Sequence, residues 1–426
     1  MAAFLEGPAL PGNLRQINRL TVLRLLRQFG PVTKPALAQY SGISRPTIAK
    51  LIEELEASGL AECIGVTTPA AGGGKPGALY RFNAEGVYCG AVFLTVDTAR
   101  LALVNGNGRI LGSLERPLGL DRRPEPVISL LVEAWQELLK SLQLSSERVL
   151  GVGIGVPGLT SFRTGVVHFA PHFPQWHDVP MKERLKELLG IEVWIDNDCH
   201  VQALAERHFG KGQAMTDFVT VESGIGVSAA FYLQDSLYRG SGETAGEIGH
   251  MTIQEDGPPC ECGNHGCWEA LASTTWLVKR AYLQQQADHG SFKWLLLPRR
   301  AQVEAGKSET LEPQLINTVA SAIFRAAQEG QPEAIVLVRQ HATHYGVGLA
   351  TIVNALNPQR IIIWGNSVAG GELFLETVRA VVQQRALVRP REMCEILFSS
   401  FTQDIGVIGA ASLVVDALFT APASSF

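Results

Sequence analysis

Three cysteines and a histidine near the middle of the chain have the spacing of metal ligands. Residues 250–269 read HMTIQEDGPPCECGNHGCWE, in a protein of 426 residues with seven cysteines in all. Four soft or borderline ligands follow the pattern His-x9-Cys-x-Cys-x4-Cys, namely His250, Cys260, Cys262 and Cys267. Imidazole and thiolate ligands from one short loop suit tetrahedral Zn²⁺, and a zinc ion with four protein ligands is structural rather than hydrolytic. We therefore predict one structural zinc ion per chain, with His265 as a rival ligand.

The surroundings of this cluster favour a metal over the alternatives. The glycines, prolines and Asn264 of the segment make it rich in turns, so it has little apolar surface in which cysteines could be buried as small hydrophobes. The N-terminus lacks the pattern of a signal peptide, and no apolar run reaches the roughly 18 residues of a membrane span. We therefore expect a cytoplasmic protein, where thiols stay reduced and clustered cysteines more often bind metal than form disulfides.

Length and charge indicate a globular protein of two or three domains with a basic N-terminal part. The chain is 46% hydrophobic and 18% charged, and chains beyond roughly 250 to 300 residues usually divide into domains. Residues 1–88 hold nine Lys and Arg against six Asp and Glu, although the whole chain has a net charge of −5. The basic charge is therefore concentrated in the N-terminal fifth.

The pattern of residues 17–59 predicts three helices that form a DNA-binding unit. The first ends at Gly30, the second runs from a Thr33 cap to Gly42, and the third begins after Ser44 with a proline in its first turn. The tight SGIS turn predicts a helix-turn-helix, and two short strands around a glycine-rich tip would make it winged. The alternative is a helical interaction module whose charges form a solvated face. The side chains expected to contact DNA are Ser44, Arg45, Thr47, Lys50 and Lys75.

The rest of the chain predicts two α/β lobes. Strands are expected within 89–118, with a hairpin turn at NGNG, followed by a helix at 126–142 and a strand at 149–160. A similar order recurs in the strands of 217–240 and at 360–366. We predict an α/β protein with a winged helix-turn-helix domain at 1–85, a first lobe at 86–210, and a second lobe at 211–426. The second lobe would carry the zinc loop, with the C-terminal helices free to pack back on the first lobe.

Four segments resemble the signatures of the ROK family, whose members are repressors, open reading frames and sugar kinases. They are GVGIGVPG (151–158), IDNDCHVQALAERHFGKG (195–212), GSGETAGEIGHM (240–251) and CECGNHGCWEA (260–270). The resemblance runs from the N-terminal unit to about residue 410. It implies an actin-like or hexokinase-like two-lobed ATPase fold, a zinc ion on the four ligands above, and a sugar in the cleft between the lobes. Carried over position by position, the sugar-binding residues would be Asn197, Asp198, Glu247, His250 and Glu269.

The zinc loop would hold two of these sugar-binding residues, because His250 and Glu269 flank the cysteines. With one ring nitrogen of His250 on zinc, the other would be free for a sugar hydroxyl. Carboxylates and amides recognise hydroxyls, and sites of this kind reject analogues that lack one. In APHFPQWHDVP, His172 stands where the family usually has Asn. Recognition of a sugar hydroxyl at this position would therefore differ from that in the family.

Two phosphate loops of the related kinases are changed in this sequence. Kinases that resemble this chain carry Asp-x-Gly-Gly-Thr in the first strand pair, where residues 93–97 here read FLTVD. A second loop, Gly-Thr-Gly-x-Gly, is replaced at 222–226 by ESGIG. Phosphoryl transfer depends on positioning the phosphates and neutralising their charge, so added carboxylates argue against a kinase. Asp198, the catalytic base that the resemblance implies for the kinases, would here be a sugar ligand only.

We therefore predict a non-enzymatic, sugar-responsive DNA-binding regulator, a repressor of carbohydrate-utilisation genes that sugar binding releases. Its partners would be a palindromic double-stranded DNA operator, a monosaccharide or derivative as effector, and a second copy of the chain in a homodimer, with a tetramer as the alternative; no membrane partner is expected. Two other functions fit the sequence less well. One is a ROK-type, ATP-dependent sugar kinase with an appended DNA-binding domain, and the other is a regulator controlled by a protein partner.

Overall fold

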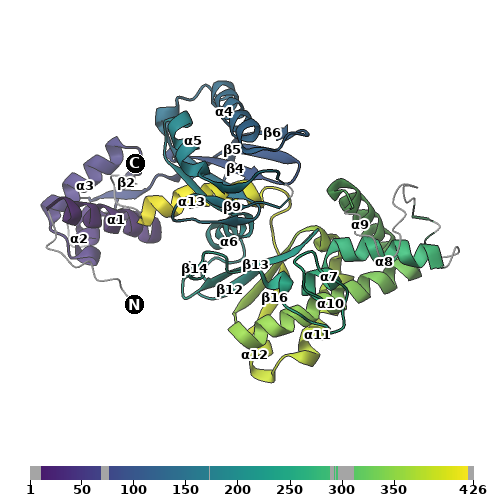
Figure 1. Ribbon diagram of the computed structural model, residues 1–426. Coiled ribbons are helices and arrows are strands. Elements are labelled where there is room, and N and C mark those ends of the chain that lie inside the picture. Colours follow the sequence, from purple (N-terminus) through teal and green to yellow (C-terminus); the bar gives the residue numbers. More distant parts are fainter. Residues whose placement is uncertain are drawn as a thin grey trace.

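The computed structural model describes residues 11–68, 76–171, 173–287, 292, 294–295 and 311–420. An N-terminal unit is followed by two α/β lobes, with the C-terminal helix running back between the first lobe and the N-terminal unit (Figure 1). Among the described residues, no helix is both long and apolar enough to cross a membrane.

The N-terminal unit contains three helices and a small antiparallel sheet. The helices are α1 (Pro11–Phe29), α2 (Lys34–Ser41) and α3 (Arg45–Ala57), and the strands are β1 (Val32–Thr33), β2 (Ala61–Val66) and β3 (Ala78–Phe82), in the order β1-β3-β2. The three predicted helices are confirmed together with their caps: Thr33 accepts from the backbone of Ala36, and Ser44 from that of Thr47. Gly42 ends α2 with a φ of 71°, a conformation that costs glycine little.

The first lobe is built on a five-stranded sheet in the order β11-β7-β4-β5-β6. Its strands are β4 (Tyr88–Leu94), β5 (Thr98–Asn105), β6 (Ile110–Pro117), β7 (Val149–Val156) and β11 (Val193–Asn197). Helices α4 (Pro124–Ser141) and α5 (Met181–Leu189) pack on one face, and α13 (Ile405–Thr420) packs on the other. A small sheet of β8 (Leu159–Thr160), β9 (Val167–Phe169) and β10 (His177–Val179) and the short turns η1 (Ala84–Gly86) and η2 (Ser146–Arg148) complete the lobe.

Gly153 of GVGIGVPG allows the C-terminal helix to approach the first sheet closely. Gly151, Gly153 and Gly155 all lie within β7. A Cβ atom on Gly153 would lie 1.8 Å from the carbonyl oxygen of Ala410 in α13. Any larger residue at this position would therefore push the helix away from the strand.

The second lobe repeats the strand arrangement of the first. Its sheet has the order β14-β13-β12-β15-β16, formed by β12 (Phe218–Ser223), β13 (Val227–Leu233), β14 (Ser236–Tyr238), β15 (Arg360–Trp364) and β16 (Glu395–Phe398). In both sheets three antiparallel strands are followed by two parallel ones. The helices of this lobe are α7 (Trp268–Ala272), α8 (Thr274–Ala287), α9 (Pro313–Gln328), α10 (Pro332–Leu356), α11 (Gly371–Arg385) and α12 (Val388–Met393), with the turns η3 (Ile248–His250) and η4 (Asn366–Gly370).

Helix α6 (Asp198–Phe209) lies between the two lobes. It packs against α13 on one side and against β12 and β13 of the second lobe on the other. Its residues 199–206 are all buried, which explains how Glu206 and His200 come to be in the interior. Because α6 follows β11 directly, it carries the end of the DND segment into the centre of the molecule.

Candidate functional site

The predicted metal ligands lie together in the second lobe. The ligand atoms of His250, Cys260, Cys262 and Cys267 all lie within 4.8 Å of one another. The Sγ atoms of Cys262 and Cys267 are 3.7 Å apart, as are His250 Nδ1 and Cys260 Sγ. A zinc tetrahedron with Zn–S bonds of about 2.3 Å has edges of roughly 3.8 Å between sulfurs, so this donor set fits zinc. His265 does not belong to the group.

The backbone of this loop is held in place by its own turns. Gly266 has a φ of 65°, and a Cβ atom there would lie 1.6 Å from the carbonyl oxygen of Gln254. The backbone N–H of Cys260 donates to the carbonyl of Asn264 at 2.8 Å, and that of Trp268 donates to Met251 at 2.9 Å. The loop therefore joins η3, which ends at His250, to α7, which begins directly after Cys267.

Glu247, His250 and Glu269 are arranged around this loop. Nδ1 of His250 faces the cysteines, and its Nε2 lies 3.9 Å from a carboxylate oxygen of Glu247. Glu269, in the first turn of α7, accepts from the backbone N–H of Val227 at 3.0 Å. Burial, with the nearby carboxylate of Glu247 among the further causes, raises the pKa of Glu269. A ring nitrogen and two carboxylates thus lie close enough for one small polyhydroxylated ligand.

The DND segment approaches from the first lobe. Asn197 caps α6 by accepting from the backbone of Cys199 at 2.9 Å, and its amide donates to the carbonyl of Gly158 at 3.0 Å. Asp198 accepts from the same N–H of Cys199 through one oxygen. Burial, and then the charge of Glu247, raises the pKa of Asp198 to about 6. The amide of Asn197 is therefore already bonded on both atoms, whereas Asp198 has an oxygen available to a ligand.

A network that the sequence analysis did not identify ties the loop before Glu247 to α6. Asp196 is fully buried and lies 2.8 Å from His200 Nδ1, while His200 Nε2 lies 3.1 Å from the carbonyl oxygen of Ala245. Arg239 donates twice to the second carboxylate oxygen of Asp196, at 2.9 and 2.6 Å. The signal was present in the sequence as an Asp and a His four residues apart, but their partners lie more than 40 residues away.

In both changed phosphate loops, several groups already have partners within the protein. In the first, Phe93 fills the space that Gly155 and Gly406 leave, and Asp97 accepts from Thr95 at 2.9 Å and from Gln314 at 3.1 Å. In the second, the hydroxyl of Ser223 donates to Ser367 at 2.7 Å within the core. The N–H of Gly224 donates to the carbonyl of Gly226 at 3.1 Å, so it is not free to bind an anion.

The predicted DNA-contacting residues share the start of α3. Ser44, Arg45 and Lys50 are exposed, and Thr47 is half-buried. The hydroxyls of Ser44 and Thr47 lie 2.8 Å apart, so both also serve the helix cap. Thr47 and Lys50 line an open depression of about 310 Å³ between α1 and α3. Lys75 and His172 lie outside the described residues.

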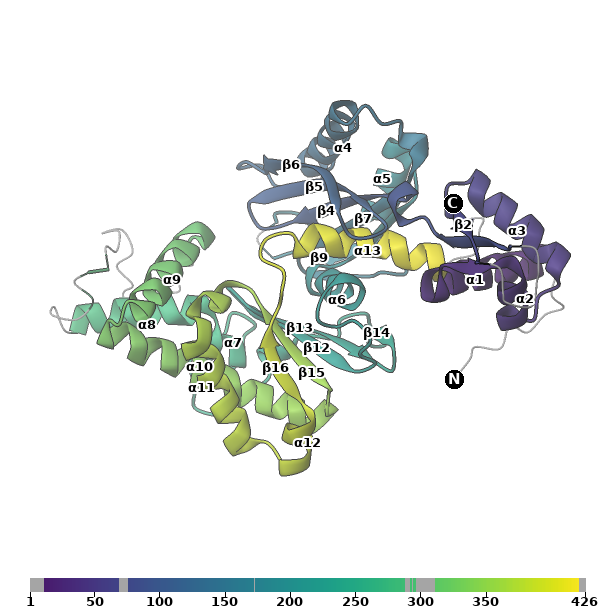
Figure 2. The same cartoon turned by 180° about the vertical axis from the view of Figure 1, so that it is seen from behind.

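The N-terminal unit lies beside the end of α13 (Figure 2), and polar contacts connect it to α6 and α13. The guanidinium of Arg24 donates to the carbonyl oxygen of Phe419 at 3.0 and 2.7 Å. Arg27 lies over the ring of Phe419 and donates to His208 Nδ1 at 2.9 Å, and His208 Nε2 in turn donates to Asp416 at 2.6 Å. A shared hydrophobic core also joins the three helices of the unit to α13.

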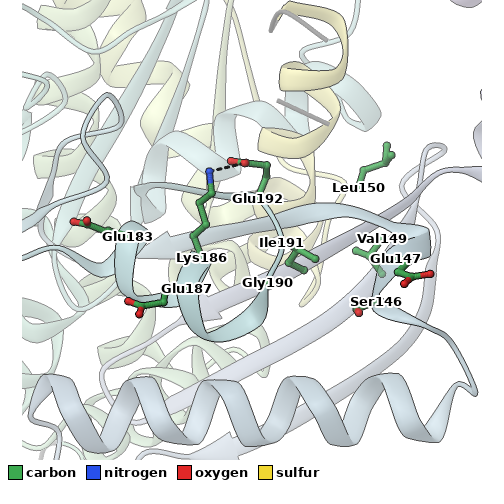
Figure 3. Close-up of a pocket in the computed structure, with 10 residues that line it drawn as sticks. All are labelled: Ser146, Glu147, Val149, Leu150, Glu183, Lys186, Glu187, Gly190, Ile191 and Glu192. Atoms are coloured by element: carbon green, nitrogen blue, oxygen red, sulfur yellow. Dashed lines mark ion pairs between the residues drawn. The ribbon is translucent and has the colours of Figure 1, made fainter. Parts of the chain in front are cut away.

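A separate depression of about 680 Å³ lies on the outer side of the first lobe, between the start of β7 and the end of α5 (Figure 3). Four glutamates and one lysine are among its lining residues, and Lys186 is paired with Glu192 at 2.6 Å. None of the predicted site residues lines it, and its acidic side chains are those of a solvated surface.

Comparisons with known proteins agree with this architecture. Residues 89–417 match the ROK family. The xylose repressor of Caldicellulosiruptor bescii is 27% identical over 96% of this chain and 98% of its own length. A glucokinase of Thermotoga maritima is 28% identical, but over 74% of this chain and 94% of its own length. A solved structure described as a ROK family transcriptional regulator, a homologue of the Escherichia coli Mlc protein, has the same fold, with a TM-score of 0.79, 24% identity, and coverage of 95% of this chain and 97% of that one.

Proposed function

Because this chain belongs to the ROK family, we propose that it is a sugar-responsive transcriptional repressor that a sugar releases from its operator. One observation carries the proposal: the ROK part is preceded by a three-helix unit with a basic exposed helix start, and a xylose repressor matches over both. The glucokinase match covers only about three quarters of the chain.

The N-terminal unit would act as a winged helix-turn-helix. The spacing of α2 and α3, joined by three residues, is that of the motif, and β2 and β3 supply the strands of a wing. Arg45 and Lys50 would reach base edges or phosphates, and two copies of the chain would read a palindromic operator. The hydroxyls of Ser44 and Thr47, at the start of the helix, would lie close to a phosphate.

The effector site would consist of Asp198 from the first lobe and Glu247, His250 and Glu269 from the second, with Asn197 holding the start of α6. Zn²⁺ bound by His250, Cys260, Cys262 and Cys267 would supply no reaction; it would hold η3 and α7 together. The distances within the loop support this assignment. A sugar bound by both lobes would stabilise their closed arrangement, as ligands do between hinged domains.

Helix α6 connects the two sites. Its first residue is Asp198, and its last turn holds His208, which contacts Arg27 of α1. A buried helix of 12 residues moves as one rigid body, so a shift of the lobes at Asp198 would displace the contact with the N-terminal unit. In a dimer, that displacement would change the distance between the two copies of α3 and lower the affinity for both half-sites.

The experiment that tests this function is selection of genomic DNA fragments bound by the purified protein, followed by competition with sugars. The proposal expects a palindromic fragment whose binding weakens with one sugar class, and no sugar-dependent ATP hydrolysis. A kinase with an appended domain would hydrolyse ATP in the presence of its sugar. The carboxylate of Glu222 and the bonded N–H of Gly224, both in a loop that binds phosphate in the kinases the chain resembles, argue against ATP hydrolysis.

A further inference from the structure

Glu222, which the sequence analysis placed in a changed phosphate loop, lies beside the site of Asp198. It is the fifth residue of β12 and pairs across the sheet with Ser228 of β13. Figure 1 shows β12 and β13 next to α6, whose first residue is Asp198. Both Glu222 and Asp198 keep part of their surface open to solvent, although protein surrounds them on most sides.

One carboxylate oxygen of Glu222 is bonded and the other is directed toward the 223–226 loop. Oε2 accepts from Ser228 Oγ at 3.3 Å and from Cys199 Sγ at 3.6 Å. Oε1 lies where a Cβ atom on Gly224 would be 2.9 Å away. Oε1 therefore lies on the side of this loop, and Oε2 lies on the side of Cys199, the residue that follows Asp198.

The acidic groups around this point have little positive charge near them. Within the described part of the chain, no ion pair includes Asp198, Glu222 or Glu269. Burial, and then the charge of Asp198, raises the pKa of Glu222 to about 8, and burial raises that of Asp198 to about 6. Both directions are those expected of carboxyl groups that repel one another in a poorly solvated place.

Two backbone amides near this point already have acceptors within the protein. The N–H of Gly224 donates to Gly226, and the N–H of Val227 donates to Glu269. A sugar hydroxyl can donate to a carboxylate or accept from a carboxylic acid, so it suits Glu222 in either protonation state. A phosphate dianion can only accept, and beside the ionised form of Glu222 it would lie next to further negative charge.

We propose that Glu222 restricts the effector to an uncharged sugar and excludes the same sugar phosphorylated on the hydroxyl that faces Asp198. The inference rests on the proposed function, since it names the class of sugar for that site. Glu222 would act as a specificity-determining residue, since Cys199 donates both to Glu222 through its thiol and to Asp198 through its backbone N–H.

The test is titration calorimetry at pH 9, above the pKa of about 8 at which Glu222 becomes ionised, with D-xylose, D-glucose and N-acetyl-D-glucosamine, and with the terminal phosphate of each. We expect at least one free sugar to bind, and its phosphate to bind at least tenfold more weakly. Glu222→Gln keeps the shape of the side chain and removes its charge. In this variant, the ratio between the dissociation constants of the phosphate and of its parent sugar should fall at least tenfold. Glu187→Gln, a change of the same chemistry in the distant depression of Figure 3, should leave the ratio unaltered.

The outcomes separate this inference from the proposed function. A phosphate that binds the unchanged protein as tightly as its parent sugar would overturn the inference alone. An unaltered ratio in folded Glu222→Gln, verified by its melting temperature, would overturn the role of Glu222. Absence of binding by all six compounds would overturn the sugar-responsive function on which the inference rests.

Discussion

Arg27 of α1 and His208 of α6 are hydrogen-bonded, with 2.9 Å between Nη2 and Nδ1, and this contact joins the N-terminal unit to the helix that begins at Asp198. Since the guanidinium can only donate, Nδ1 accepts, and the proton on Nε2 is directed to Asp416. The bond therefore orders three elements at once: α1, α6 and α13.

Removal of this contact should make operator affinity much less sensitive to the sugar. Arg27→Met keeps much of the packing on Phe419 but cannot donate to His208. We expect operator affinity to remain within about threefold of the unchanged protein, while the sugar-induced loss of affinity falls well below the roughly 5- to 150-fold typical of allosteric coupling. Fluorescence anisotropy with a labelled operator measures both, and Gln28→Ala, at the neighbouring exposed position, is the control. A full sugar response in Arg27→Met would show that coupling takes another route.

The metal prediction concerns Cys262. Cys262→Ser removes one of four ligands, so zinc should fall from about one per chain to near zero by plasma mass spectrometry. Sugar binding should be lost with it, because the loop holds His250 and Glu269 in position. Cys63→Ser, at an exposed cysteine in β2, should retain both. Normal sugar affinity in a metal-free variant would refute the link between metal and site.

The DNA prediction concerns the first turns of α3. Arg45→Ala and Lys50→Ala should each weaken operator binding by about 1 to 3 kcal/mol if the side chain reads a base edge. Lys75→Ala should weaken all sequences alike and flatten the salt dependence. Lys140→Ala, on the exposed face of α4, should change neither. Wild-type affinity in all three variants of the N-terminal unit would place the DNA interface elsewhere.

Stability should depend on pH through Glu222. Its pKa is raised from 4.5 to about 8 in the folded protein, so the folded state binds more protons than the unfolded state between these values. The free energy of unfolding should therefore fall as pH rises from about 5 to 8. Below the unfolded pKa, the stabilisation contributed by Glu222 should be present in full. Glu222→Gln should remove this component and be more stable than the unchanged protein at pH 8.5, by about 1 to 3 kcal/mol. Urea denaturation at pH 5 and 8.5 measures the free energy of unfolding of both proteins. If Glu222→Gln differs from the unchanged protein by the same amount at both pH values, the raised pKa of Glu222 is contradicted.

Local patterns predicted the elements well, and they also predicted the metal cluster, because its ligands lie within 18 residues of one another. Caps such as Ser44 and the closing Gly42 depend on neighbouring residues only, so the helices of the N-terminal unit lie where they were expected. The parts that were missed depend on distant contacts. Glu222 approaches Cys199 through the packing of two lobes, and Gly153 of β7 is explained by a helix more than 250 residues later.

The most direct measurement of the central claim is operator affinity with and without sugar in Asp198→Asn. The change preserves the cap of α6 but removes a charge that a sugar hydroxyl would contact. We predict unchanged affinity for the operator without sugar in this variant, and no release at sugar concentrations that release the unchanged protein. If Asp198→Asn responds to the sugar as the unchanged protein does, or if the sugar tightens operator binding in either protein, the repressor mechanism proposed here is wrong.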